Sequence, residues 1–109
     1  MPEPLRITID SLAECELVAV HGELDGGTAG ELTAQLDVLV AGRRPVVVDL
    51  TALVFIDSGG LHALMKPRPD ARLSVVCPPG NVSRVMSVVQ LEHVLPVYQR
   101  LDEALAALR

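Results

Sequence analysis

The feature that most constrains the fold is an apolar run that ends in an Asp-Ser-Gly-Gly turn, over residues 46–60. The nearly unbroken apolar character of residues 46–50 is typical of a strand covered on both faces, which places it near the centre of a sheet. The run brings Asp57 and Ser58 to the start of a short helix. Because a helix N-terminus has unpaired N–H groups and a partial positive charge, it can hold a hydroxyl, a carboxylate or a phosphate. Ser58 is therefore the first candidate functional residue.

Residues 57–60 also have a purely structural interpretation. Asp and Ser are among the best N-cap residues, and Gly59 and Gly60 ease the change of direction from strand to helix. The glycine pair is too short for a phosphate-cradling loop, since the chain has neither G-x-x-x-x-G-K-[ST] nor G-x-G-x-x-G. The sequence gives little support to nucleotide binding.

Composition narrows the class of protein. A chain of 109 residues, 50% of them hydrophobic, fits one compact domain with a real core. The formal net charge of -5, with one Tyr, one Phe and no Trp, argues against nucleic acid, which is bound by basic patches and stacking rings. A protein or a small molecule is the expected partner.

The sequence also predicts a cytoplasmic location. Residues 1–6 lack the basic flank and apolar run of a secretory signal. Asp49 and Asp57 interrupt the longest apolar stretches well short of the ~20 residues of a membrane helix, so no membrane insertion is expected. Cys15 and Cys77 show neither C-x-x-C nor metal-ligand spacing, and we interpret them as buried thiols. A redox pair between them is an alternative without support. We expect no metal and no cofactor.

Hydrophobic periodicity predicts an α/β order of elements. Strands are expected at 5–10, 16–21, 46–50, 73–77 and 95–98. Helices are expected from a capping box at Thr28 to Gly42, for about two turns after Ser58 until Pro67, from a cap at Asn81 to about residue 89, and from Asp102 onward. This order gives a mixed sheet of four or five strands packed against about four helices. The predicted core residues are Val18, Val20, Leu32, Leu36, Val46, Val48, Leu73 and Val75.

Two motifs resemble those of the STAS domain family. Residues 22–25, Gly-Glu-Leu-Asp, resemble its G-E-[LI]-D segment, and residues 55–61, Phe-Ile-Asp-Ser-Gly-Gly-Leu, resemble its F-[IM]-D-S-[ST]-G-L turn. Arg84-Val-Met, with Leu91, stands where the family has R-L-F and a trailing Leu. The resemblance runs from about residue 5 to the carboxyl terminus, and it implies that residues 1–109 form a single STAS-like domain.

The resemblance also implies a function. Stand-alone members of the family are anti-sigma factor antagonists: each binds an anti-sigma factor, itself a serine kinase, and so releases a sigma factor. Carried over by position, the phosphorylated residue is Ser58, and no residue is catalytic. The implied partner-binding residues are Asp25, Asp57, Ser58, Gly59, Gly60 and His62.

The chain departs from the family pattern at three places. Gly59 replaces a second Ser or Thr, and His62 stands where a Gly is usual. The segment Lys66-Pro-Arg-Pro ends the helix early, although in the family this helix forms part of the partner-binding face.

Alternatives are open at the sequence level. Asp25 and Asp57 are either partner contacts or simple caps. The domain as a whole is alternatively a STAS module that is never phosphorylated and serves as a small subunit of a transporter or signalling scaffold. A serine hydrolase using Ser58 and His62 is a remote third reading, because no oriented third group and no G-x-S-x-G elbow accompany them. The sequence makes no prediction of oligomeric state.

Overall fold

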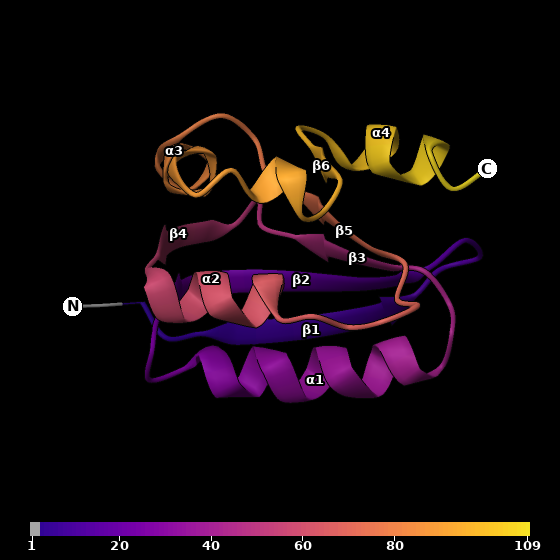
Figure 1. Ribbon diagram of the computed structural model, residues 1–109, viewed down its shortest axis with the longest axis horizontal. Coiled ribbons are helices and arrows are strands. Elements are labelled where there is room, and N and C mark those ends of the chain that lie inside the picture. Colours follow the sequence, from indigo (N-terminus) through magenta and orange to yellow (C-terminus); the bar gives the residue numbers. More distant parts are fainter. Residues whose placement is uncertain (1–2) are drawn as a thin grey trace.

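The computed structural model describes residues 3–109 (Figure 1). An initial hairpin is followed by helices interspersed with strands, as the apolar pattern predicts, except that β3 is followed directly by β4 and α3 by η1. The elements are β1 (Arg6–Ser11), β2 (Glu16–Leu24), α1 (Ala29–Ala41), β3 (Val46–Asp49), β4 (Leu53–Ile56), α2 (Ser58–Met65), β5 (Leu73–Val76), α3 (Asn81–Val88), the 3-10 helix η1 (Leu91–His93), β6 (Val97–Tyr98) and α4 (Leu101–Ala106).

The strands form one mixed sheet in the order β1-β2-β3-β5-β6, with β4 paired to the carboxyl-terminal part of β2. Among the strands formed by residues 3–109, the hairpin β1–β2 alone is antiparallel, and the other pairs are parallel. Strand β3 lies in the middle, and Val46, Val47 and Val48 are all fully buried. The predicted central strand and the α/β class are therefore confirmed.

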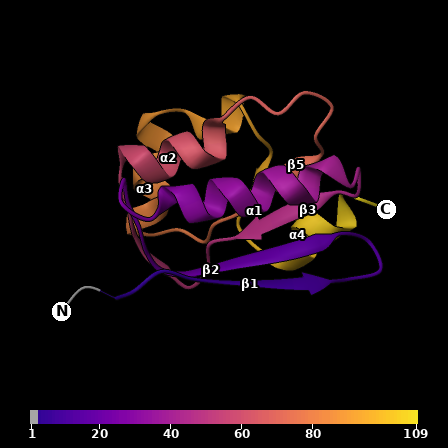
Figure 2. The ribbon, with the colours of Figure 1, turned by 90° about the horizontal axis from the view of Figure 1, so that it is seen from below.

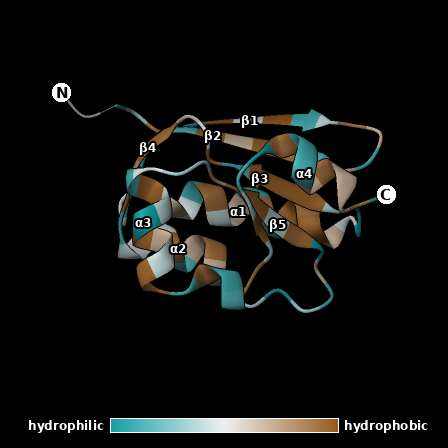
Figure 3. Cartoon of the chain, turned by 90° about the horizontal axis from the view of Figure 1, so that it is seen from above, coloured by the Kyte–Doolittle hydropathy of each residue, from teal (hydrophilic) through white to brown (hydrophobic). Residues whose placement is uncertain are grey.

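Helices cover both faces of the sheet. Successive β3 side chains point to opposite faces, so Val46 and Val48 belong to one apolar cluster and Val47 to another. The first cluster packs under α1, α2, α3 and η1, and the second packs under α4. Figure 1 shows α1 below the strands and α4 above them, and Figure 3 shows apolar β3 and β5 between the helices. All eight residues predicted for the core are buried.

Two elements are absent from the sequence-based expectation, and β2 extends three residues further than expected, to Leu24. The residues described form six strands, because Leu53–Ile56 is a separate strand after the turn at Thr51 and Ala52. Its apolar run continues that of β3, so hydrophobicity alone does not divide them. The short helix η1 was also not predicted; it begins after Gln90, which has a positive φ of 56°.

The starts of two helices differ from the prediction. Thr28 is the N-cap of α1, as predicted, but its side chain makes no cap bond, so the predicted capping box is absent. Asn81 is the first residue of α3 rather than its cap. The N-cap is Gly80, whose N–H donates to Ser83 Oγ. In both cases a neighbouring group satisfies the helix end, which residue preference alone does not reveal.

Candidate functional site

The candidate site lies where two loops meet at the carboxyl ends of the parallel strands β2 and β4. Glu23 pairs with Phe55 and Leu24 with Ile56, so the chain leaves both strands at the same edge. The loop that follows β2 leads into α1, and Asp57 leads directly into α2. The two STAS-like motifs, far apart in the sequence, therefore lie side by side.

Gly22 begins the first motif at a position that only glycine fits. Its φ is +86°, and a Cβ there would lie 2.0 Å from the carbonyl oxygen of Pro4. The register of the β2–β4 pairing shifts between Gly22 and Glu23. Gly22 thus lets β2 bend as its pairing passes from β3 to β4, and this bend aims the β2–α1 loop at α2.

Asp57 joins the two loops. Its Oδ1 accepts hydrogen bonds from the N–H groups of Gly59, at 2.9 Å, and Gly60, at 3.2 Å. Its Oδ2 accepts a longer bond, 3.4 Å, from the N–H of Gly26. The carboxylate therefore caps α2 and also holds the β2–α1 loop. Because Asp57 occupies two of the N–H groups in the first turn of α2, the N-terminus of this helix has fewer free donors for a phosphate than the sequence alone indicates.

Asp25 organises the loop on the other side. Its Oδ1 accepts from the N–H groups of Gly27, at 2.9 Å, and Thr28, at 3.0 Å, and from Thr28 Oγ1. The local hydrogen bonds expected of Asp25 as a capping residue are thus present. Both carboxylates keep part of their surface exposed, so the loop pair carries two negative charges beside Ser58.

The two glycines of the turn are required by close packing. A Cβ on Gly59 would lie 2.5 Å from the Cα of Gly26, and a Cβ on Gly60 would lie 2.6 Å from the carbonyl oxygen of Leu24. Gly59 therefore lets the β2–α1 loop approach α2. The larger Ser or Thr of the family pattern does not fit there without displacing that loop. Gly60 is buried, so it positions the turn and offers no surface of its own.

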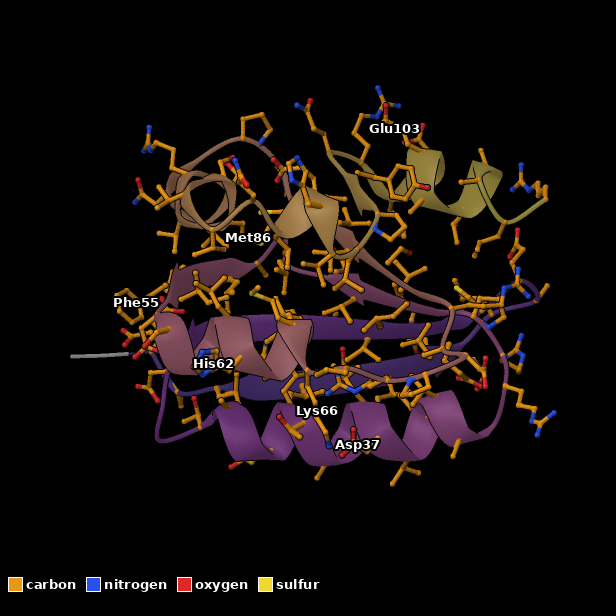
Figure 4. The ribbon with its side chains drawn as sticks, in the orientation of Figure 1. Asp37, Phe55, His62, Lys66, Met86 and Glu103 are labelled. Carbon is orange, nitrogen blue, oxygen red and sulfur yellow. The ribbon has the colours of Figure 1, made fainter. Side chains whose placement is uncertain are left out.

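Ser58 is the first residue of α2, and its side chain is exposed. His62 lies one turn further along the same helix and is also exposed; Figure 4 shows it on the α2 ribbon. Within residues 3–109 no hydrogen bond joins Ser58 to His62, so the geometry gives no support to the hydrolase reading. Helix α2 ends at Met65, close to the predicted length of two turns.

Sequence reasoning missed two exposed apolar side chains beside the turn. Val54 and Phe55 on β4 are 49% and 46% exposed, and Figure 4 shows Phe55 at the end of the molecule where α2 begins. Phe55 is the only Phe of the chain. The sequence indicates Phe55 only through its place in the F-I-D-S-G-G-L motif. That its side chain points to solvent follows only once β4 is recognised as a separate strand.

An ion-pair cluster holds the other end of α2 against α1. Asp37 on α1 accepts from Lys66 Nζ and, at 3.0 Å, from Arg68 Nε. The hydrogen bond from Lys66 lowers the pKa of Asp37 most, and the hydrogen bond from Arg68 lowers it further. Figure 4 shows Lys66 and Asp37 facing each other. The early end of α2 at Lys66 is therefore fixed to the neighbouring helix.

The described part of the chain shows no group of three or more His, Cys, Asp or Glu arranged to hold a metal ion. Within residues 3–109 no helix is long and apolar enough to cross a membrane.

A mixed α/β sheet with a serine-bearing turn at a helix N-terminus fits the small STAS-like domain that the two motifs imply. The family model of the STAS domain matches residues 6–104, and the chain belongs to this family.

Solved structures agree with this assignment. The chain is similar to an anti-sigma factor antagonist from Mycobacterium paratuberculosis, with 30% sequence identity and a TM-score of 0.88 over 100% of this chain and 97% of that one. It also shares its fold with the anti-sigma factor antagonist SpoIIAA in the unphosphorylated form, at 16% identity and a TM-score of 0.69 over 94% of this chain and 96% of that one. The phosphorylated form of the Bacillus protein SpoIIAA matches at 16% identity and a TM-score of 0.68, over 95% and 100% of the two chains.

Proposed function

We propose that this protein is an anti-sigma factor antagonist: it binds an anti-sigma factor that is also a serine kinase, frees a sigma factor, and is switched off by phosphorylation of Ser58. The observation that carries the proposal is the exposed Ser58 at the N-terminus of α2, in a chain with 30% identity to an anti-sigma factor antagonist over its whole length. The protein acts by binding in the cytoplasm, as one domain, and without catalysis of its own.

The proposed partner-binding surface consists of the two loops and the first turn of α2. Ser58 and His62 are exposed on α2, and Asp25 and Asp57 are partly exposed in front of it. Gly59 contributes through the close approach of the loops, and Gly60 supports the turn from below. A partner with basic groups complements the two carboxylates.

A phosphate at Ser58 changes the charge of this surface without unfolding it. Phosphorylation adds about -1.5 to -2 charges at pH 7. Asp57 already occupies the N–H groups of Gly59 and Gly60, so the phosphate stays outward and adjacent to a carboxylate. The added charge and bulk then stand in the contact itself, and the partner is released.

The experiment combines phosphorylation with binding. The protein is incubated with the kinase encoded beside its gene and ATP, the modified residue is located by mass spectrometry, and binding is measured by calorimetry. We expect phosphate on Ser58. Ser58→Ala binds without being switched off, and Ser58→Glu binds at least about tenfold more weakly, a change of ~1.4 kcal/mol.

Ser87→Glu is the matched control, because Ser87 is an exposed serine on α3, outside the loop pair. It should bind like the parent. Phosphate on another residue, or parent-like binding by Ser58→Glu, contradicts the switch. That result favours the unphosphorylated scaffold module, in which Ser58 only begins the helix.

A further inference from the structure

The edge strand β1 leaves one side of its backbone unpaired. It pairs with β2 over six residues, Arg6–Ser11, and it ends the strand order. In an antiparallel pair only alternate residues direct their N–H and C=O groups at the neighbour, so the other β1 residues direct theirs outward. Figures 2 and 3, seen from opposite sides, both show β1 as the outermost strand with no helix beyond it. Such an edge is a template for another strand.

The charges on β1 are arranged with opposite sign about its centre. Arg6 and Asp10 lie two residues to either side of Thr8, and all three side chains are exposed. Edge charges usually keep strands apart. Within residues 3–109 Asp10 takes part in no ion pair, and Arg6 only approaches His21 Nδ1, at 3.5 Å.

We propose that β1 is a self-complementary interface, through which two copies of this chain pair antiparallel about Thr8. In this register Arg6 of each copy lies opposite Asp10 of the other, so both edge charges become cross-strand ion pairs. Parallel pairing in register would bring like charges together. Antiparallel registers centred on Ile7 or Ile9 leave Arg6 without Asp10 as its partner. Opposite charges placed directly across strands stabilise the pairing, and like charges destabilise it.

The apolar side chains of β1 fit the same register. Ile7 and Ile9 pair with Val20 and Val18 of β2, so they lie on the face covered by α1. Ile7 packs against the core, but Ile9 is 38% exposed. In the proposed pairing Ile7 of one copy lies opposite Ile9 of the other, which covers this exposed surface. Pro4 has no N–H to donate and limits the pairing at its amino-terminal end.

The dimer leaves both candidate sites open. The site follows the carboxyl end of β2, beside Arg6, because Arg6 pairs with His21. The two-fold axis through Thr8 reverses the strand direction. The two sites therefore lie at opposite ends of the joined sheet, and the proposal is independent of the proposed function.

The test measures association of the full chain by analytical ultracentrifugation up to millimolar concentration. We expect a concentration-dependent dimer. Asp10→Lys places cations opposite Arg6 of the second copy and raises the dissociation constant at least about tenfold. Arg6→Asp places a carboxylate opposite Asp10 of the second copy and should raise the dissociation constant to a similar extent. The double variant Arg6→Asp/Asp10→Lys restores the complementarity and the dimer.

Glu92→Lys, with the same charge change on the exposed side of η1, is the control and should dimerise like the parent. Circular dichroism confirms that each variant is folded. Hydrogen exchange of the β1 amides should slow as the concentration rises. A parent that stays monomeric, an Asp10→Lys variant that dimerises like the parent, or a double variant that stays monomeric overturns the proposal. Protection at a different surface overturns it as well.

Discussion

Cys15 and Cys77 pack on opposite faces of the sheet. Cys15 belongs to the apolar cluster under α4, and Cys77 to the cluster under α1, α2 and α3. Both are free thiols and both are buried. Burial raises the pKa of each thiol, with the charge of Glu14 adding to this at Cys15 and that of Asp49 at Cys77. The structure thus supports two structural thiols, which lie in different apolar clusters and are not joined by a disulfide.

We expect neither thiol to react while the protein is folded, because the thiolate is the reactive form and both its population and its access are reduced. A chromogenic disulfide reagent should modify Cys15 and Cys77 only as fast as the chain unfolds, and denaturant should accelerate both reactions together. Cys15→Ala and Cys77→Ala should bind the partner like the parent. Rapid modification of native protein, or binding that depends on oxidation, contradicts this prediction.

At the level of single residues, the sequence predicted burial better than hydrogen-bond partners. The eight core residues followed from periodicity, since each strand or helix has one face to bury. The caps followed only in part, because Asp57 caps α2 as residue preference predicts but the starts of α1 and α3 differ. Asp25, Thr28 and Asn81 all have side chains that favour helix starts, and the choice among them depends on loop geometry: Asp25 accepts the N–H of Thr28, and Gly80 stands at the cap before Asn81.

Helix α1 is held to the sheet by a narrow buried face. Ala29, Leu32 and Leu36 are its buried residues, whereas Val38 is 72% exposed. Replacing Leu36 by Ala leaves a cavity in a packed core and should lower the free energy of unfolding by about 2–5 kcal/mol. Val38→Ala removes apolar atoms from solvent and should change it by less than about 0.5 kcal/mol. Urea unfolding followed by circular dichroism measures both, and equal losses contradict the observed orientation of α1.

The junction between α1 and the end of α2 depends on Asp37. Arg68 has only 4% of its side chain exposed, and Asp37 is its carboxylate partner. Asp37→Asn leaves this buried guanidinium without a counter-charge and should destabilise the fold. Glu31→Gln, an exposed change on the same helix, should cost less.

The loss of stability in Asp37→Asn should depend on pH. The pKa of Asp37 lies below its ordinary value of 3.8, so its ion pairs contribute stability above that pH, and the contribution disappears as the pH falls through the lower, folded-state pKa. The parent should therefore exceed Asp37→Asn in stability at neutral pH, and the two should converge in strong acid. Thermal unfolding at a series of pH values measures this difference. A gap that persists below the folded-state pKa assigns the effect to packing instead.

At the level of elements, the pattern gave the α/β order but not the division of one long apolar run. Residues 46–56 contain β3 and β4, which pair with different parts of β2. Hydrophobicity records only that both strands are apolar, and the three residues between them carry no glycine or proline to mark a turn. The separate strand β4 follows from the bend of β2 at Gly22, which brings the carboxyl-terminal part of β2 beside residues 53–56.

At the level of the whole molecule, the candidate site exists because this bend brings together loops that are 31 residues apart. The contact from Gly26 to Asp57 joins them. The sequence identified Asp25, Asp57 and the glycine turn as separate signals. Their contact could not be predicted, since it depends on the parallel pairing of β2 with β4.

Gly59 tests this tertiary arrangement directly. An alanine Cβ there would meet the backbone of Gly26, at 2.5 Å from Cα and 2.8 Å from N, and backbone cannot give way as a flexible side chain can. Gly59→Ala should therefore lower the free energy of unfolding by more than ~1 kcal/mol, although alanine is the better helix former. It should also shift the amide NMR signal of Gly26 and weaken partner binding.

Gly30→Ala on α1 is the control, because a Cβ at Gly30 meets nothing within 4 Å. There the same substitution should stabilise the protein by about 0.4–1 kcal/mol and leave binding unchanged. If Gly59→Ala is as stable as Gly30→Ala and the Gly26 signal does not move, the two loops do not meet in solution, and Asp57 acts as a cap for α2 alone.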